Sequence, residues 1–99
     1  MTWQPITSTQ LEGIVARQLQ SCTPSQQKAF SRFRVPFYKV PIQAHEESVF
    51  VLAHLPGGLL YYEDIEEGFE VGILGVDGTL PGRGCNQYEL CHVLTQTGL

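Results

Sequence analysis

The sequence has few of the features that mark membrane and secreted proteins. Its longest apolar stretches are short, as in VFVLAHL (49–55), far below the roughly 20 residues that span a bilayer. Its first ten residues, MTWQPITSTQ, have neither the positive region nor the apolar region of a secretory signal. We therefore expect a soluble, cytoplasmic protein that has no membrane partner.

Cysteine is also scarce, with three residues and no CxxC pair. An odd count at these spacings is not a disulfide framework, so we expect reduced thiols. Cys22 and Cys91 lie beside apolar helical stripes, where a packed and inert thiol is the usual outcome. Cys85 precedes a predicted helix, whose dipole would lower the pKa of its thiol. It is therefore the candidate nucleophile or redox residue.

Motifs for metals and nucleotides are missing as well. The three histidines lie in no HExxH or zinc-finger spacing, and no EF-hand loop pattern is present. The stretch LPGRGCNQYEL (80–90) is a glycine-rich loop that enters a helix, and Arg83, Gly84 and Asn86 make it a candidate anion site. It lacks the Walker lysine and the third glycine of a dinucleotide fingerprint. We expect no metal and no cofactor.

The charge is divided between the two halves of the chain. Residues 1–44 have five basic residues against one acid, a net charge of +4, whereas residues 45–99 have one against nine, a net charge of −8. Basic and aromatic residues alternate within 32–39, as in single-strand binders. An acidic field nevertheless repels phosphate backbones and attracts basic proteins. We expect no nucleic-acid partner, and basic residues of the first half that offset the acidic half.

Ninety-nine residues are typical of one domain, here residues 1–99. The apolar spacing predicts a helix over 9–22, with Thr9 and Glu12 as its capping pair. A second helix over 23–33 has Thr23 as N-cap, Pro24 at its first position and Gln26 completing a capping box.

The period then changes to two, which predicts strands at 35–42, 48–55, 59–64 and 69–76. Prolines in the first of these confine it to an edge, whereas 48–55 has the composition of a central strand that holds a hydrogen-bonded His54. Asn86 and Glu89 predict the cap of a last helix that buries Leu90, Val93 and Leu94. The order ααββββα with short links predicts an α+β fold. We expect two layers, in which two N-terminal helices and one C-terminal helix cover one face of an antiparallel sheet of about four strands.

The stretch YYEDIEEGFE (61–70) gathers half of the acidic residues of the chain. We place its tyrosines at the end of one strand and its carboxylates in the turn to the next. Like charges repel, so we expect water to screen them there, and we see no carboxyl isolated from solvent. As a surface it would attract a basic partner. The candidate binding residues are Tyr61, Tyr62, Glu63, Asp64, Glu66, Glu67 and Glu70.

We therefore expect a small, non-enzymatic module that binds a basic protein through an acidic face, as an inhibitor or immunity protein does. One alternative is a thiol-dependent enzyme or redox protein that uses Cys85. The other is a homodimer that assembles through residues 35–42 or through the strand that ends the sheet.

Overall fold

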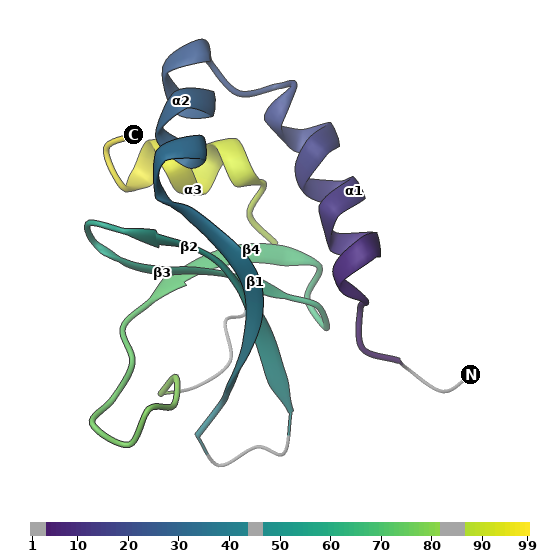
Figure 1. Cartoon of the computed structure of the whole chain (residues 1–99), viewed down its shortest axis with the longest axis vertical. Coiled ribbons are helices and arrows are strands. Elements are labelled where there is room, and N and C mark those ends of the chain that lie inside the picture. Colours follow the sequence, from purple (N-terminus) through teal and green to yellow (C-terminus); the bar gives the residue numbers. More distant parts are fainter. Residues whose placement is uncertain (1–3, 44–46, 82–86) are drawn as a thin grey trace.

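The computed structural model describes residues 4–43, 47–81 and 87–99, and it confirms the predicted α+β fold (Figure 1). The four strands form one antiparallel sheet in the order β1-β2-β3-β4, with the proline-bearing strand at one edge and 48–55 inside, as predicted. None of the helices in the described ranges combines the length and the hydropathy that crossing a bilayer requires. The elements are α1 (Ser8–Leu19), α2 (Pro24–Phe33), β1 (Arg34–Pro41), β2 (Ser48–Leu55), β3 (Gly58–Glu63), β4 (Gly68–Gly72) and α3 (Leu90–Gln96).

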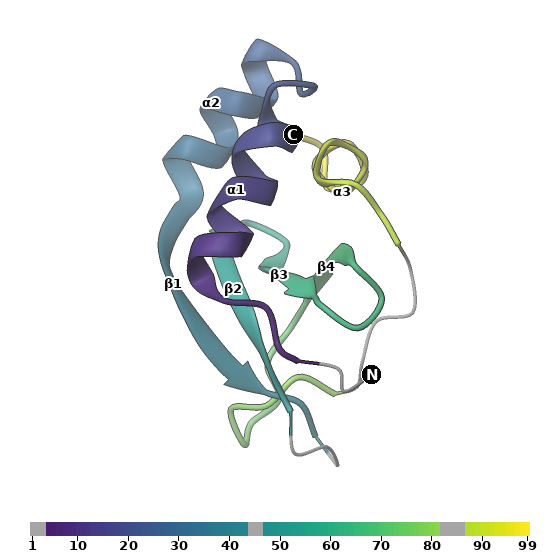
Figure 2. The same cartoon turned by 90° about the vertical axis from the view of Figure 1, so that its right-hand side faces the viewer.

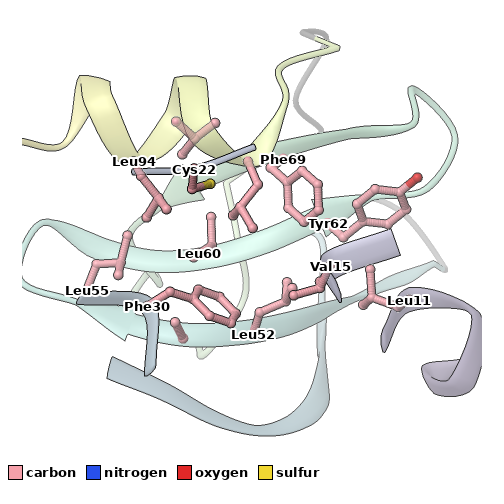
Figure 3. Packing of buried hydrophobic residues seen from close by; sticks show 13 residues of the cluster. Leu11, Val15, Cys22, Phe30, Leu52, Leu55, Leu60, Tyr62, Phe69 and Leu94 are labelled. Carbon is pink, nitrogen blue, oxygen red and sulfur yellow. The ribbon is translucent and has the colours of Figure 1, made fainter. Parts of the chain in front are cut away.

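The three helices cover one face of the sheet and enclose the larger core (Figures 2 and 3). Leu11 and Val15 of α1 and Phe30 of α2 are at most 1% exposed in this cluster. Because successive side chains of a strand alternate between faces, only half of each strand faces the helices. The strand and α3 members of this cluster are Leu52, Ala53, Leu55, Leu60, Tyr62, Phe69, Leu90, Val93 and Leu94.

The opposite face of the sheet is covered in part by the segment after β4, residues 73–81, which we call the strap (the green loop at the lower left of Figure 1). Leu80 of the strap is 1% exposed in a second cluster that contains Val40, Val51 and Tyr61. Its N–H donates to Pro41 O (3.0 Å), and its carbonyl accepts from Gln43 N–H (2.7 Å). The strap therefore ties the end of β4 to the far edge strand.

The last strand is shorter than predicted, because it ends at Gly72 and not at residue 76. The register pairs Gly72 with Leu59, so Ile73 would lie opposite Gly58, where β3 begins. Beyond Gly72 β3 offers only one more residue, so β4 could not continue to residue 76. Ile73, Leu74 and Val76 leave the sheet in the strap and are exposed.

Helix α1 begins two residues earlier than predicted. Its N-cap is Thr7 and not Thr9, and the capping box is closed by Gln10 and not by Glu12. Both pairs have the same spacing, but Ile6 lies just before Thr7 and packs on the core that holds Leu11. This is the position of a hydrophobic staple, which favours the earlier start. The box predicted for α2, Thr23 with Gln26, is confirmed.

Helix α3 begins at Leu90 with Glu89 as its N-cap, so the prediction of Asn86 as the cap is wrong. Its predicted buried face of Leu90, Val93 and Leu94 is confirmed. At its end Gly98 has a φ of 82°, and Leu99 N–H donates to Leu94 O (2.8 Å). This is the pattern of a glycine that ends a helix in the left-handed conformation.

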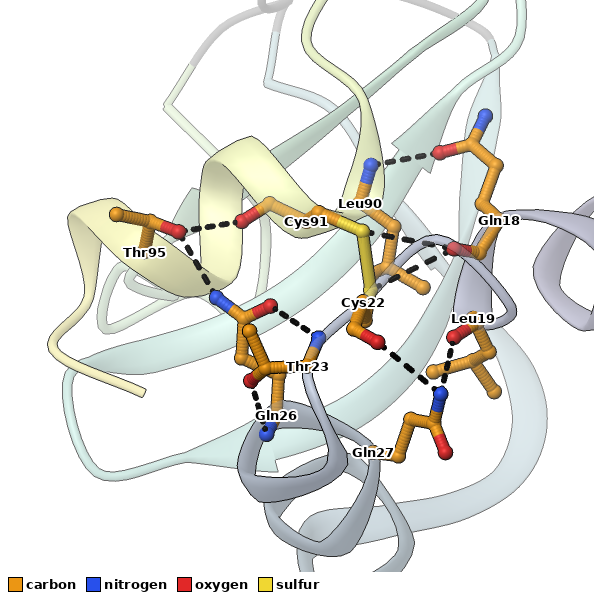
Figure 4. The surroundings of a disulfide bond; sticks show 9 residues. All are labelled: Gln18, Leu19, Cys22, Thr23, Gln26, Gln27, Leu90, Cys91 and Thr95. Carbon is orange, nitrogen blue, oxygen red and sulfur yellow. Dashed lines mark hydrogen bonds between the residues drawn. A yellow bond between two sulfur atoms is a disulfide. The ribbon is translucent and has the colours of Figure 1, made fainter.

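The prediction of reduced thiols at Cys22 and Cys91 is wrong, because these two residues form a disulfide (Figure 4). The bond joins the segment after α1 to α3 across 69 residues of sequence. Around it Leu90 N–H donates to Gln18 Oε1 (2.6 Å), and Gln26 Nε2 donates to Thr95 Oγ1 (2.8 Å). One covalent and two polar links therefore hold all three helices together at this point.

Replacing both Cys22 and Cys91 with alanine should lower the free energy of unfolding, because it removes a constraint on a long loop of the unfolded chain. For a loop of this length the expected loss is up to about 4 kcal/mol. Urea denaturation of the oxidised protein, the reduced protein and the double variant measures it. The reduced protein and the variant should have the same free energy of unfolding. A reduced protein as stable as the oxidised one would contradict the stabilising role of the disulfide.

Candidate functional site

The acidic residues lie at the predicted place, in the connection between two strands. Strand β3 ends at Glu63 and β4 begins at Gly68, so residues 64–67 form the connecting turn, which we call the acidic turn. The predicted role of its residues in partner binding stays a prediction. Their positions differ, however, from those of a uniformly solvated tip.

Tyr61 and Tyr62 point to opposite faces of the sheet, and each is only 5% exposed. Tyr62 lies in the core beneath the helices, beside Phe69 (Figure 3), and the centroids of the two rings are 5.0 Å apart. Tyr61 lies under the strap, where a Cβ added at Gly72 would be 3.2 Å from its ring and 3.0 Å from Leu80. Neither ring is available as an exposed anchor, because both faces of the sheet are covered at this point.

Glu63 contradicts the expectation that no carboxyl is isolated from solvent, because its exposed fraction is 0%. Its Oε1 accepts from Ile65 N–H (3.3 Å) within the turn. A charged group accepts such burial only where hydrogen bonds compensate it. Glu63 is therefore part of the structure of the turn and does not lie on its surface.

Asp64 joins the acidic turn to the start of α1. Its Oδ2 accepts from Ile6 N–H at 3.1 Å, although the two residues are 58 positions apart. Ile6 immediately precedes the N-cap Thr7, so this bond fixes the first turn of α1 against the β3–β4 connection. The carboxylate is partly buried and acts as a structural acceptor on one side of the turn.

Of the other two carboxylates of the turn, Glu67 is exposed and Glu66 is half-buried. Glu67 is the one residue other than glycine with a positive φ (58°) within the described ranges. A side chain in the left-handed region costs roughly 1–2 kcal/mol, and glycine would avoid that cost. The turn therefore keeps a carboxylate where glycine would be more stable.

A cleft of about 510 Å³ separates α1 from the acidic turn. One wall consists of Gln10, Gly13, Ile14 and Arg17, which follow one another at helical spacing along α1. The facing wall consists of Tyr62, Asp64 and Glu67. Gln4, Ile6 and Thr9 complete the lining at the start of the helix. This volume is in the range of sites that hold small ligands or a short piece of chain.

The cleft affects the acidity of the tyrosine in its wall. The pKa of Tyr62 is raised above its ordinary value, first by burial and then by the negative charges of Glu67 and Asp64. The phenol therefore stays neutral and can donate a hydrogen bond at any physiological pH. The wall formed by the turn thus presents carboxylates beside one neutral hydroxyl.

The other predicted site residues are the candidate nucleophile, Cys85, and the candidate anion site, Arg83, Gly84 and Asn86. All four lie outside the described residues. Within the described ranges no three His, Cys, Asp or Glu side chains are grouped so that they could hold a metal. His54 is hydrogen-bonded as predicted, with its Nε2 2.7 Å from Tyr38 Oη.

The contacts described for two basic residues of the first half are with Glu12 and with aromatic rings, and the predicted offset of the acidic half stays a prediction. Arg34 pairs with Glu12 in its own half of the chain, at 3.3 Å. Its guanidinium also lies over the rings of Phe30 and Phe37. Lys39 lies over Phe50 on the neighbouring strand. These cations are satisfied by nearby rings and by Glu12.

The α1 wall of the cleft was missing from the sequence-based prediction. No residue of the helix predicted over 9–22 was a candidate site residue, and Gly13 lies within that helix. A Cβ added there would meet nothing within 4 Å, so the position is open toward the cleft. Glycine inside an amphipathic stripe was the available signal, because it marks a place where a helix leaves room beside it.

Comparison with known proteins adds no relative, since no family model, curated protein or solved structure matches the chain. The functional argument therefore depends on the cleft and on the charges around it.

Replacing Glu67 with glutamine should lower the pKa of Tyr62, because it removes the larger of the two charge effects. Glu66→Gln is the matched control, since Glu66 is not among the causes of the shift. Tyrosine ultraviolet absorbance followed through alkaline pH measures the change. The raised pKa also makes a contribution to stability that is present below about pH 10 and is lost as the pH rises through the folded value. Equal titration curves for wild type and Glu67→Gln would contradict the arrangement of the cleft.

Proposed function

We propose that this chain is a non-enzymatic binding module that engages a basic partner protein at the edge of the acidic turn. The single observation that carries the proposal is the cleft between α1 and the turn, into which Asp64 and Glu67 project their charge. Residues 45–99 carry a net charge of −8, which attracts a basic surface over long range and increases its association rate.

The burial of individual residues limits which of the candidate binding residues can contact a partner. Tyr61, Tyr62 and Glu63 support the fold, since each is at most 5% exposed. The carboxylates that we assign to partner binding are those of the exposed Glu67 and the half-buried Glu66. Asp64 contributes to the field of the cleft while its Oδ2 holds Ile6. The partner therefore meets a rigid rim of charge and no aromatic anchor.

The other two hypotheses from the sequence have less support. The enzyme hypothesis depends on Cys85, which lies outside the described residues. Assembly through β1 is opposed by Pro36 and Pro41, which cannot donate to a further strand, and by the strap, whose Leu80 bonds to Pro41 and Gln43. The edge of β4 is occupied in part as well, because Phe69 N–H donates to Tyr88 O (2.9 Å).

The cytoplasmic location predicted from the sequence stays a prediction. The disulfide between Cys22 and Cys91 weighs against it, because glutathione and thioredoxin keep most cytosolic thiols reduced. An oxidising compartment fits the bridge better.

Two variants of equal charge test the proposed surface. Glu67→Gln and Glu89→Gln each remove one exposed carboxylate, but only the first lies at the cleft. A basic protein captured by the wild type at low salt should bind Glu67→Gln about two- to fivefold more weakly, as expected for one exposed ion pair. Glu89→Gln should bind almost as the wild type does.

Isothermal titration at low and at physiological salt provides the measurement. The difference between the two variants should shrink as salt screens the charges. If both variants lose affinity equally, general charge attracts the partner and the acidic turn is not the docking site.

A further inference from the structure

The cleft has opposite charges at its two walls that do not neutralise each other. Arg17 lies in the last turn of α1 and lines the cleft, as does Glu67 of the acidic turn. Arg34 with Glu12 is the one ion pair found within 4 Å among the described parts of the chain. Arg17 and Glu67 therefore line the same cleft without an ion pair between them.

The acidic turn meets the start of α1 through Asp64, whereas Arg17 lies in the last turn of that helix. The bond from Ile6 to Asp64 fixes the acidic turn beside the start of α1. Arg17 is seven residues beyond Gln10 on the same stripe, which corresponds to about 10 Å along a helix axis. Between them lie Gly13, which leaves open space, and Ile14, which offers an apolar surface. The cleft thus has acidic residues on the wall formed by the turn, and an apolar and a basic residue on the wall formed by α1.

We infer that the cleft takes a short, extended segment of the partner in which a basic and an acidic side chain are two residues apart. The lysine or arginine side chain meets Glu67, and the aspartate or glutamate meets Arg17. In an extended chain residues i and i+2 point the same way, roughly 7 Å apart, and long side chains span the rest. The methylene stem of the basic residue packs on Ile14 while its charged group meets the exposed carboxylate of Glu67. This inference rests on the proposed function, because it names the part of the partner that enters the site.

Short capped peptides test the inference without the whole partner. The probes are acetyl-Lys-Ala-Glu-amide and the reversed acetyl-Glu-Ala-Lys-amide, with controls in which glutamine replaces either charged residue. Titration into ¹⁵N-labelled protein, followed by amide chemical shifts, gives the affinity and the place of binding. At least one of the two charged peptides should shift Gln10, Gly13 and Arg17. It should bind about three- to fivefold more tightly than either of its glutamine controls.

Paired variants assign each end of the peptide to one end of the cleft. Arg17→Gln should abolish the advantage of the acidic residue and keep that of the basic one, and Glu67→Gln should do the reverse. Gly13→Leu should fill the cleft and weaken every peptide, whereas Gly13→Ala should strengthen the helix and leave binding nearly unchanged. The alanine variant thus controls for the change in the helix.

The inference is overturned if no peptide shifts these amides at millimolar concentration. It is also overturned if each variant weakens all peptides by the same factor. Either result leaves the proposed function standing if a basic partner still binds Glu67→Gln more weakly than Glu89→Gln. Only the inference about the peptide then falls. If the peptides bind as expected and no basic protein makes that distinction, the cleft is a peptide site and the proposed docking surface is wrong.

Discussion

The placement of α1 is the constraint on which the site depends. The helix is fixed at its start by Asp64, whose carboxylate accepts from Ile6 N–H. At its other end it is fixed by the bond from Leu90 N–H to Gln18 in its last turn and, just beyond the helix, by the disulfide from Cys22 to Cys91. Between these points Leu11 and Val15 are buried on the core while Gly13 and Arg17 are exposed. A helix held at both ends and packed along one face keeps Gly13 and Arg17 at a fixed distance from the acidic turn. The cleft is the space between them.

The acidic turn combines two kinds of carboxylate that serve different purposes. Glu63 and Asp64 hold the turn and the helix in place through backbone amides. Glu67 lies outside this network, in a backbone conformation that glycine would adopt at lower cost. Under the proposed function, stability and recognition are divided between neighbouring residues, and a strained backbone such as that of Glu67 is the kind of position where function is sought. On that proposal, the rigidity of the first pair would keep the entropic cost of binding at Glu67 low.

The fold could be predicted largely from the sequence, because its elements are encoded locally. The capping box of Thr23 with Gln26, the prolines of β1 and the apolar run of β2 each carry their own signal. The sequence-based predictions were wrong where a contact between residues far apart in the sequence determines the local structure. The two candidate capping boxes at the start of α1 have the same spacing, and the contact of Ile6 with the core favours the earlier one. The end of β4 is set by the length of its partner strand β3. The odd number of cysteines suggested free thiols and could not show that the fold places Cys91 of α3 beside Cys22. The acidic connection was predicted in the right place, but its orientation and the α1 wall depend on tertiary packing. Local patterns do not contain that packing.

The most direct test of this account is the hydrogen exchange rate of the Ile6 amide. Ile6 precedes the helix, so no bond within α1 protects its N–H, and its acceptor is Asp64 in the acidic turn. A hydrogen bond to a charged group contributes about 1.5–3 kcal/mol, so we predict exchange at least about tenfold slower than in an unstructured peptide. Exchange at the unstructured rate would mean that α1 is not fixed to the turn, and the cleft would then lose one of its walls.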